Sequence, residues 1–336
     1  MIVAAEAGAM GMLIDGVWTT KRYEPDEAGK FVREQSQFRD RVTAGDSSGH
    51  PAVAGRYHLY VAHACPWVHR TLLARGLLGL EQAISISVVD PFMGDDGWAF
   101  TDRDGCVPDP IFGARFLRSI YLRADPGYSG RVTVPVLWDR ERATIVCNES
   151  RELLRMLDVE FAALHTRPIT LFPEPLQRRV DRTIDQIYEP INNGVYKAGF
   201  ATQQAAYEEA VRELFAALDH WDGVLAEQRF LCGDVVTEAD LCLFTTLLRF
   251  DPVYHGHFKC NLRRIVDYPH LSGYLRDLYQ LPGVAELCRL DHIKEHYYRS
   301  HPHVNPTRIV PLGPISTLEQ AHDRGRFGGE LFAPKS

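Results

Sequence analysis

The sequence predicts an α/β domain followed by an all-helical domain, and two patterns indicate this division. Up to about residue 163, short runs of β-branched and apolar residues alternate with segments of helical pattern, which is typical of α/β domains. Beyond residue 176, apolar residues recur every three or four positions, which indicates amphipathic helices. The 336 residues are enough for two domains that each have a core of their own.

Eight elements are expected in the first half. Strands are expected at 57–61, 84–89, 131–138 and 143–146. Helices are expected at 66–79, at 114–123 and from 148 onward, and a loop is expected at 90–113. Strand–helix–strand followed by helix–strand–strand–helix is the order of a thioredoxin-like fold.

Pro135 is an unusual residue for the interior of a predicted strand, because proline removes a hydrogen bond from the strand ladder. Either the peptide bond before Pro135 is cis and lifts this edge out of the sheet, or the segment is an edge strand with an ordinary trans proline. In the first case the backbone N–H and C=O of Val134 stay free to pair with an extended peptide ligand.

The second half carries two helix signals. One long helix has an apolar stripe formed by Tyr207, Val211, Leu214, Leu218, Trp221 and Leu225. A second helix begins near Thr237, which can cap it with Asp240 as the reciprocal partner.

These patterns divide the chain into five parts. They are an N-terminal extension at 1–50, a thioredoxin-like domain at 51–163, a proline-rich linker at 164–175, an all-helical domain at 176–300 and a C-terminal extension at 301–336. We expect the last part to be irregular, because it is rich in proline and glycine.

The composition is that of a globular protein and excludes several functions. The formal charge of −7 gives no basic footprint for nucleic acid. No apolar stretch approaches the ~20 residues needed to span a membrane. Seven cysteines without paired spacing, and an N-terminus with no basic region, favour reduced thiols over a secreted protein. We therefore expect a cytoplasmic protein with no nucleic-acid or membrane partner.

Cys65 is the first candidate for reactivity. It lies between the strand at 57–61 and the helix beginning at Pro66, where unpaired backbone N–H groups and the helix dipole favour a negative charge. We expect this thiol to be substantially ionised at neutral pH. Because the fourth position is Val68, the segment has no Cys-x-x-Cys pair, which favours a single-thiol nucleophile. On this segment alone, a buried structural cysteine is equally compatible.

Several motifs together resemble the glutathionyl-hydroquinone reductases, the xi class of the glutathione transferases. They are the lone Cys-Pro, the Val-Pro strand, the Glu-Ser helix start and three longer segments, at 57–73, 128–150 and 292–314. The family usually begins near a Gly-x-Leu-x-Asp-Gly segment, which is matched at 11–16. Residues 1–9 are thus expected to be an upstream extension, or else Met10 is the true start and Met1 is a misplaced one.

The resemblance implies a glutathione site in the first half. Cys65 would be the nucleophile, and Val134 would pair with the cysteinyl part of glutathione. Glu149 and Ser150 would hold the γ-glutamyl end, where a helix N-terminus also favours a carboxylate. Trp98 would pack beside the tripeptide.

A basic group should neutralise the glycyl carboxylate of glutathione. Arg131 is the preferred residue, with Arg118 and Arg123 as competitors. Taken singly, each residue of this set also has an ordinary interpretation. Glu149 could be helix-start charge, Trp98 a loop anchor and Arg131 a solvated side chain.

The resemblance also implies the reaction: a glutathionyl-hydroquinone and glutathione give free hydroquinone and glutathione disulfide through a mixed disulfide at Cys65. Phenols near the ring oxygens would supply protons. The matching tyrosines are Tyr196, Tyr297 and Tyr298, with Tyr254 as a weaker candidate. The resemblance further implies a homodimer. Any one of the fourteen tyrosines could still be an ordinary packed aromatic.

Three other interpretations were weighed. An omega-like thiol transferase or dehydroascorbate reductase would share Cys65 and the glutathione site. A non-catalytic protein with the glutathione-transferase fold would instead carry hydrophobic ligands or act in a complex. A metal site would use the histidines at 255, 257, 292, 296, 301 and 303. Because their spacing does not match His-Glu-x-x-His and no cysteine pair accompanies them, we expect no metal.

Overall fold

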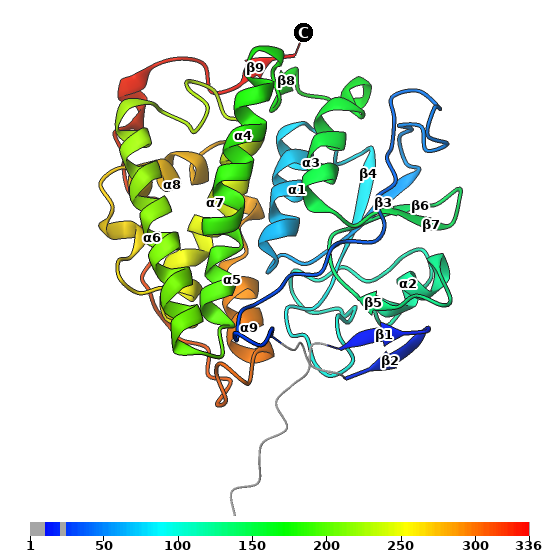
Figure 1. The fold of residues 1–336 in the computed structure, drawn as a ribbon. Coiled ribbons are helices and arrows are strands. Elements are labelled where there is room, and N and C mark those ends of the chain that lie inside the picture. Colours follow the sequence, from blue (N-terminus) through cyan, green and yellow to red (C-terminus); the bar gives the residue numbers. More distant parts are fainter. Residues whose placement is uncertain (1–10, 21–24, 336) are drawn as a thin grey trace, which may run out of the picture.

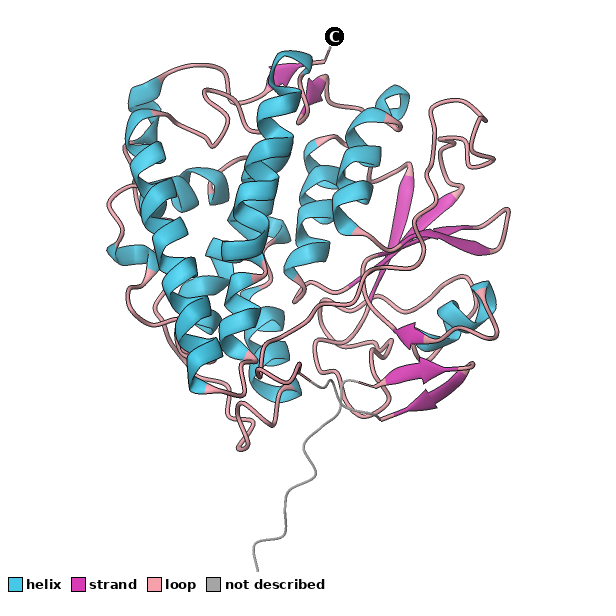
Figure 2. Cartoon of the chain, in the orientation of Figure 1, coloured by secondary structure: helices cyan, strands magenta, loops and turns pink. Residues whose placement is uncertain are grey.

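The computed structural model describes residues 11–20 and 25–335. Residues 1–10, with both candidate start methionines, lie outside the described residues. No helix in the described part of the chain is both long and apolar enough to cross a membrane. The strands of the first half gather on one side of the molecule and most helices on the other (Figure 2).

A four-stranded mixed sheet forms the centre of the first half. Its strands are β3 (Tyr57–Val61), β4 (Ile84–Val88), β6 (Val136–Asp139) and β7 (Thr144–Cys147), in the order β4-β3-β6-β7. β3 is parallel to β4 and antiparallel to β6, and all its residues are buried. The helices of this half are α1 (Pro66–Leu77), α2 (Arg118–Ala124) and α3 (Ser150–Val159). α1 and α3 lie between the sheet and the second half (Figure 1).

The second half is helical. Its α-helices are α4 (Gln177–Ile187), α5 (Gly194–Gly199), α6 (Gln204–Glu227), α7 (Glu238–Arg249), α8 (Leu271–Tyr279) and α9 (Leu290–Ser300). Two π-helical turns, η3 (Tyr188–Asn192) and η4 (Phe250–Tyr254), continue α4 and α7. Short 3-10 turns are η1 (Ala162–Leu164), η2 (Glu174–Leu176), η5 (Ile265–Asp267), η6 (Ala285–Leu287) and η7 (Arg324–Phe327).

Both helix signals of this half are confirmed. The predicted stripe faces inward along α6, where all its members are buried except the half-buried Tyr207. Thr237 and Asp240 form the predicted capping box of α7, and the Thr237 N–H donates to the Asp240 carboxylate at 2.8 Å.

The single strand predicted at 131–138 is wrong, because the segment is divided. Its first part is β5 (Gly130–Arg131), which pairs with β1 (Met12–Ile14) of the N-terminal hairpin formed with β2 (Val17–Thr19). Its second part is β6, which begins only at Val136. The peptide bond between Val134 and Pro135 is cis, one of the two alternatives that the sequence left open.

The C-terminal extension is mostly irregular, as predicted, but it ends in a strand. β9 (Ala333–Pro334) pairs antiparallel with β8 (Ile169–Thr170), which lies within the predicted linker. Two-residue strands carry no periodicity that a sequence pattern could reveal. The β8–β9 pair therefore holds the segment at 333–334 against the connection between the two halves.

Candidate active site

A cleft of about 880 Å³ is lined by residues from both halves and by the N-terminal segment 31–37. The structure brings eight of the predicted site residues to this cleft. They are Cys65, Trp98, Arg131, Val134, Glu149, Ser150, Tyr196 and Tyr297. Tyr298 is not among the lining residues.

Cys65 is the N-cap residue of α1, at the end of the loop that follows β3. Its Sγ lies 3.9 Å from the carbonyl oxygen of Val134. Burial raises the pKa of this thiol, whereas the backbone N–H of Val68, the positive charge of Arg249 and the N–H of Trp67 act to lower it. The expected helix N-terminus is therefore present, but desolvation outweighs it and the pKa moves upward, opposite to the expected direction.

The start of α3 forms the end of the cleft expected to bind the γ-glutamyl group. Glu149 is the N-cap, and its carboxylate accepts hydrogen bonds from the Arg151 N–H at 3.2 Å and the Ser36 hydroxyl at 3.1 Å. Ser150 is the first helical residue and is buried. The unpaired N–H groups of this turn give a site that favours a carboxylate. Val134 lies nearby outside the strand ladder, because β6 begins two residues later.

Of the three arginines weighed for the glycyl carboxylate, only Arg131 lines the cleft. Its guanidinium lies 3.6 Å from the carboxylate of Glu34. Arg118 donates to the side chain of Asp96 at 2.9 Å. Arg123 lies 4.2 Å from the ring centroid of Phe112.

Three tyrosine hydroxyls form a chain that starts at the cleft, which Tyr196 and Tyr297 line and Tyr254 does not. Tyr297 from α9 is in the middle, with its oxygen 2.5 Å from that of Tyr196 in α5 and 3.0 Å from that of Tyr254 in η4. Burial raises the pKa of all three phenols. They are therefore proton donors at neutral pH, not phenolates.

Tyr298, the other tyrosine of the predicted pair, points elsewhere. Its hydroxyl donates to the carbonyl oxygen of Pro252 at 3.2 Å. Neighbouring residues of a helix point in directions about 100° apart, so only one of the pair can face the cleft. The structure thus places Tyr254, the weaker candidate, beside Tyr297 in place of Tyr298.

Sequence reasoning missed an aromatic and cationic wall formed by the N-terminal segment. The Arg33 guanidinium lies 4.7 Å from the ring centroid of Trp67 and 5.1 Å from that of Tyr196, and Phe31 stacks on Tyr196. The Arg33 Nε donates to the Asn193 side chain at 3.0 Å. Trp67 follows Cys65 by only two residues, so its place near the thiol could have been predicted from the sequence. Segment 31–37 has no regular pattern, so its place at the cleft could not.

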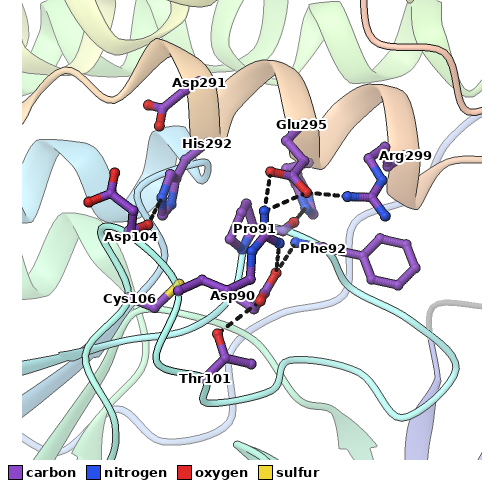
Figure 3. Close-up of polar contacts among 12 residues, drawn as sticks. Asp90, Pro91, Phe92, Thr101, Asp104, Cys106, Asp291, His292, Glu295 and Arg299 are labelled. Atoms are coloured by element: carbon purple, nitrogen blue, oxygen red, sulfur yellow. Dashed lines mark hydrogen bonds and ion pairs between the residues drawn. The ribbon is translucent and has the colours of Figure 1, made fainter.

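A polar network fixes α9 to the loop at 90–106 (Figure 3). His292 and His296 use ring N–H groups to donate to the backbone carbonyls of Asp104 and Pro91, at 2.8 and 2.9 Å. Trp98 from this loop stacks on His296, with ring centroids 4.9 Å apart. The predicted glutathione wall at Trp98 and the tyrosine chain at Tyr297 consequently share one support.

The same loop and helix are joined by an ion-pair bridge. Arg103 contacts the carboxylates of Asp90 at 3.0 Å and Glu295 at 2.8 Å. All seven cysteines are free. Among the described residues, no group of three or more His, Cys, Asp or Glu side chains is placed to hold a metal ion.

Comparison with known proteins agrees with this geometry. Family models described as glutathione S-transferase N-terminal and C-terminal domains match residues 64–160 and 204–277. Glutathionyl-hydroquinone reductase YqjG of Escherichia coli is 50% identical over 328 residues, which cover 95% of this chain and 100% of YqjG. Glutathionyl-hydroquinone reductase PcpF of Sphingobium chlorophenolicum is 50% identical over 310 residues, or 92% and 98% of the two chains.

Solved structures give the same answer. A xi-class transferase from Natrialba magadii superposes with a TM-score of 0.91 at 53% identity, covering 97% of this chain and 99% of its own. The glutathione-bound structure of YqjG superposes with a TM-score of 0.87 at 48% identity, covering 94% and 99%. These matches confirm the predicted fold class, a thioredoxin-like domain followed by an all-helical one. The chain belongs to the glutathionyl-hydroquinone reductases, the xi class of the glutathione transferases.

Proposed function

We propose that this protein reduces glutathionyl-hydroquinones to hydroquinones, with glutathione as co-substrate and Cys65 as nucleophile. The observation that carries this proposal is a cleft lined by a cysteine at a helix N-terminus and by two protonated tyrosines, Tyr196 and Tyr297, with Tyr254 hydrogen-bonded behind Tyr297. The relatives that are half identical to this chain and carry the same activity in their names support it.

In the first step the glutathione part of the substrate occupies the thioredoxin-like half. The γ-glutamyl carboxylate binds the N-terminus of α3 at Ser150, and Arg131 neutralises the glycyl carboxylate. The backbone of Val134 pairs with the cysteinyl unit. This placement brings the thioether sulfur to Cys65, which lies beside Val134, and leaves the ring toward the tyrosine chain.

Cleavage requires a leaving group better than an aryl carbanion. Loss of a proton from a ring hydroxyl and gain of one at the ring carbon that carries sulfur give a keto tautomer. The Cys65 thiolate then attacks the glutathione sulfur and forms a mixed disulfide. The electron pair of the carbon–sulfur bond returns to the ring, which regains aromaticity as a hydroquinone phenolate and takes up one proton to give hydroquinone. A second glutathione thiolate attacks the mixed disulfide, releases glutathione disulfide and restores Cys65.

The tyrosine chain suits the ring chemistry. Burial keeps Tyr196, Tyr254 and Tyr297 protonated at neutral pH, so Tyr196 and Tyr297, which line the cleft, can donate to a ring oxygen on which negative charge develops. Because Tyr297 links the other two, a proton that leaves one phenol can be replaced from the next.

The remaining proposals concern the setting of the enzyme. We infer a cytoplasmic homodimer and retain the divisions at 51–163 and 176–300 as domain boundaries. The seven free cysteines support a reducing compartment. Light scattering of the purified chain checks the dimer.

Turnover of glutathionyl-menadiol with excess glutathione tests the function. We expect wild type to release menadiol and Cys65→Ser to lose at least about 10³-fold in rate, because a hydroxyl cannot form the mixed disulfide. Cys106→Ser is a matched control, because Cys106 is also free and half-buried. Wild type that reduces dehydroascorbate but not glutathionyl-menadiol would be an omega-like transferase. Glutathione binding without either activity would indicate a ligand-binding protein.

A further inference from the structure

Arg249, the last residue of α7, is a fully buried cation between the two halves. It is 0% exposed. Its Nε donates to the carbonyl oxygen of Ala64 at 2.9 Å, and one terminal nitrogen donates to that of His63 at 2.9 Å. The other donates to the carbonyl oxygen of Thr245 at 2.8 Å. Two of its three carbonyl partners thus belong to the loop that leads directly into Cys65.

No carboxylate neutralises this cation. In the part of the chain that the structure describes, Arg249 forms no ion pair with an acidic side chain, whereas the buried Arg56 pairs with Asp139 at 2.6 Å. The side chain of His69 contacts this cation, with its Nδ1 3.2 Å from a terminal nitrogen of Arg249. Burial lowers the pKa of His69 well below its usual value, so this imidazole is neutral. A buried charge without a counter-charge is costly and leaves a positive potential around it.

That potential extends to the reactive groups on both sides. Arg249 exerts the largest charge effect on Cys65 and lowers its pKa against the effect of burial. It acts in the same direction on Tyr254 and Tyr297. The reaction places negative charge on these same groups, first on the thiolate and then on ring oxygens that the phenols hold.

We propose that Arg249 is a positioning residue whose uncompensated charge stabilises the anion at Cys65 and the negative charge that develops beside the tyrosine chain. It does so through the loop at 63–64 and without touching the substrate. A carboxylate partner would cancel this field, so the lack of one among the described residues fits the role. The part concerning the ring rests on the proposed function, whereas the part concerning the thiol does not.

Several other groups face the same two centres. Around Cys65 they are the N–H groups of Trp67 and Val68 on its own helix, Arg33 from the N-terminal segment and Tyr196 from α5. Around Arg249 they are His63, His69, Tyr254, Cys288, His296 and Tyr297. Arg33 is a second cation near the thiol, and it is half-buried against Trp67 and Tyr196. A change at Arg249 leaves this second cation in place.

The pH dependence of Cys65 alkylation by iodoacetamide, followed by mass spectrometry of the peptide that contains it, tests this role without any substrate. We expect Arg249→Gln to move the profile to higher pH and slow alkylation at pH 7 about threefold to tenfold, as expected on removing a nearby opposite charge. Arg249→Lys keeps the charge and should retain a profile close to wild type.

Arg324→Gln is the matched control. Arg324 is also 0% exposed and donates to backbone carbonyls, but at the end of α6. It should lower the melting temperature and leave the alkylation profile unchanged. A folded Arg249→Gln protein with the wild-type profile would overturn the proposal. If that variant does not fold, an Arg249→Lys profile displaced to higher pH would overturn it equally. A wild type without hydroquinone turnover would affect only the proposed function.

Discussion

Arg249 and Arg324 are two buried arginines with similar bonding and different surroundings. Each is 0% exposed and solvated by main-chain carbonyls. The carbonyl partners of Arg324 all lie near the C-terminal end of α6, where the helix dipole already favours a cation. Those of Arg249 lie partly in the loop before Cys65. The hydrogen bonds of a buried arginine therefore do not show whether its charge only stabilises the fold or also acts on the chemistry. The titratable groups close to the arginine distinguish the two cases.

In this comparison, the largest change in turnover is expected at the tyrosine chain, which lies close to Arg249. Tyr297→Phe should lower kcat for glutathionyl-menadiol by about 10²-fold, because it removes the middle hydroxyl of the tyrosine chain. Tyr298→Phe is the neighbouring control and should stay within about twofold, because its hydroxyl donates to a backbone carbonyl outside the cleft. Steady-state kinetics at 25 °C check both. A Tyr297→Phe variant with a kcat within twofold of wild type would mean that the hydroxyl chain has no role in turnover.

On the Arg324 side, stability should change and chemistry should not. Arg324→Gln should lower the free energy of unfolding by about 2–4 kcal/mol, because carbonyls at the end of α6 lose buried donors. Turnover at 25 °C should match wild type. Urea unfolding measures the first and the menadiol assay the second. Arg326→Gln, at an exposed neighbouring site, should change stability by less than about 0.5 kcal/mol. A turnover loss in Arg324→Gln would remove the contrast between the two arginines.

Part of the pH dependence of stability should come from buried histidines. Burial lowers the pKa of His63 and His296 to about 4 and that of His257 to about 3. Between about pH 6.5 and 4 the unfolded chain binds protons that the folded chain does not, so the free energy of unfolding falls as the pH falls. Urea midpoints at pH 7.5, 6 and 5 should decrease in that order. His257→Gln should flatten the trend, and a midpoint constant down to pH 5 would contradict it.

The smallest effect is expected at the ion-pair bridge between the loop at 90–106 and α9. Arg103→Ala should cost at most about 1 kcal/mol, because Arg103 is about half exposed and surface ion pairs are weak. The loss should shrink further in 0.5 M NaCl, since salt screens such pairs. Thermal melts at low and high salt show whether it does. A larger and salt-independent loss would mean that this bridge behaves like the buried arginines.

Local signals predicted much of this molecule. Thr237 and Asp240 define a helix start within four residues, and the Pro135 anomaly correctly pointed to an irregular edge. The position of Cys65 at a helix N-terminus could be predicted because a strand-to-helix junction is visible in the sequence. Its surroundings were not visible, so burial and its effect on the pKa could not be foreseen.

Features that depend on distant contacts escaped prediction. The choice of Tyr254 over Tyr298 depends on which way each side chain faces after the helices pack. In the sequence, Arg249 is an ordinary residue near a helix end. Its partners His63 and Ala64 lie nearly two hundred residues earlier, and only the structure shows this contact. The β8–β9 pair joins the two ends of the helical half with strands too short to show a pattern.

The wall formed by residues 31–37 has a consequence for engineering. It closes the cleft over Trp67 and Tyr196, yet it precedes the first strand of the central sheet. With the ring placed beside the tyrosine chain, as proposed above, this segment would contact it, so the choice of aromatic ring would not transfer with the thioredoxin-like and helical domains alone. A hybrid that exchanged only this segment would reshape the ring pocket and keep both nucleophile and phenols, which makes it the natural place to redirect the enzyme toward other quinones.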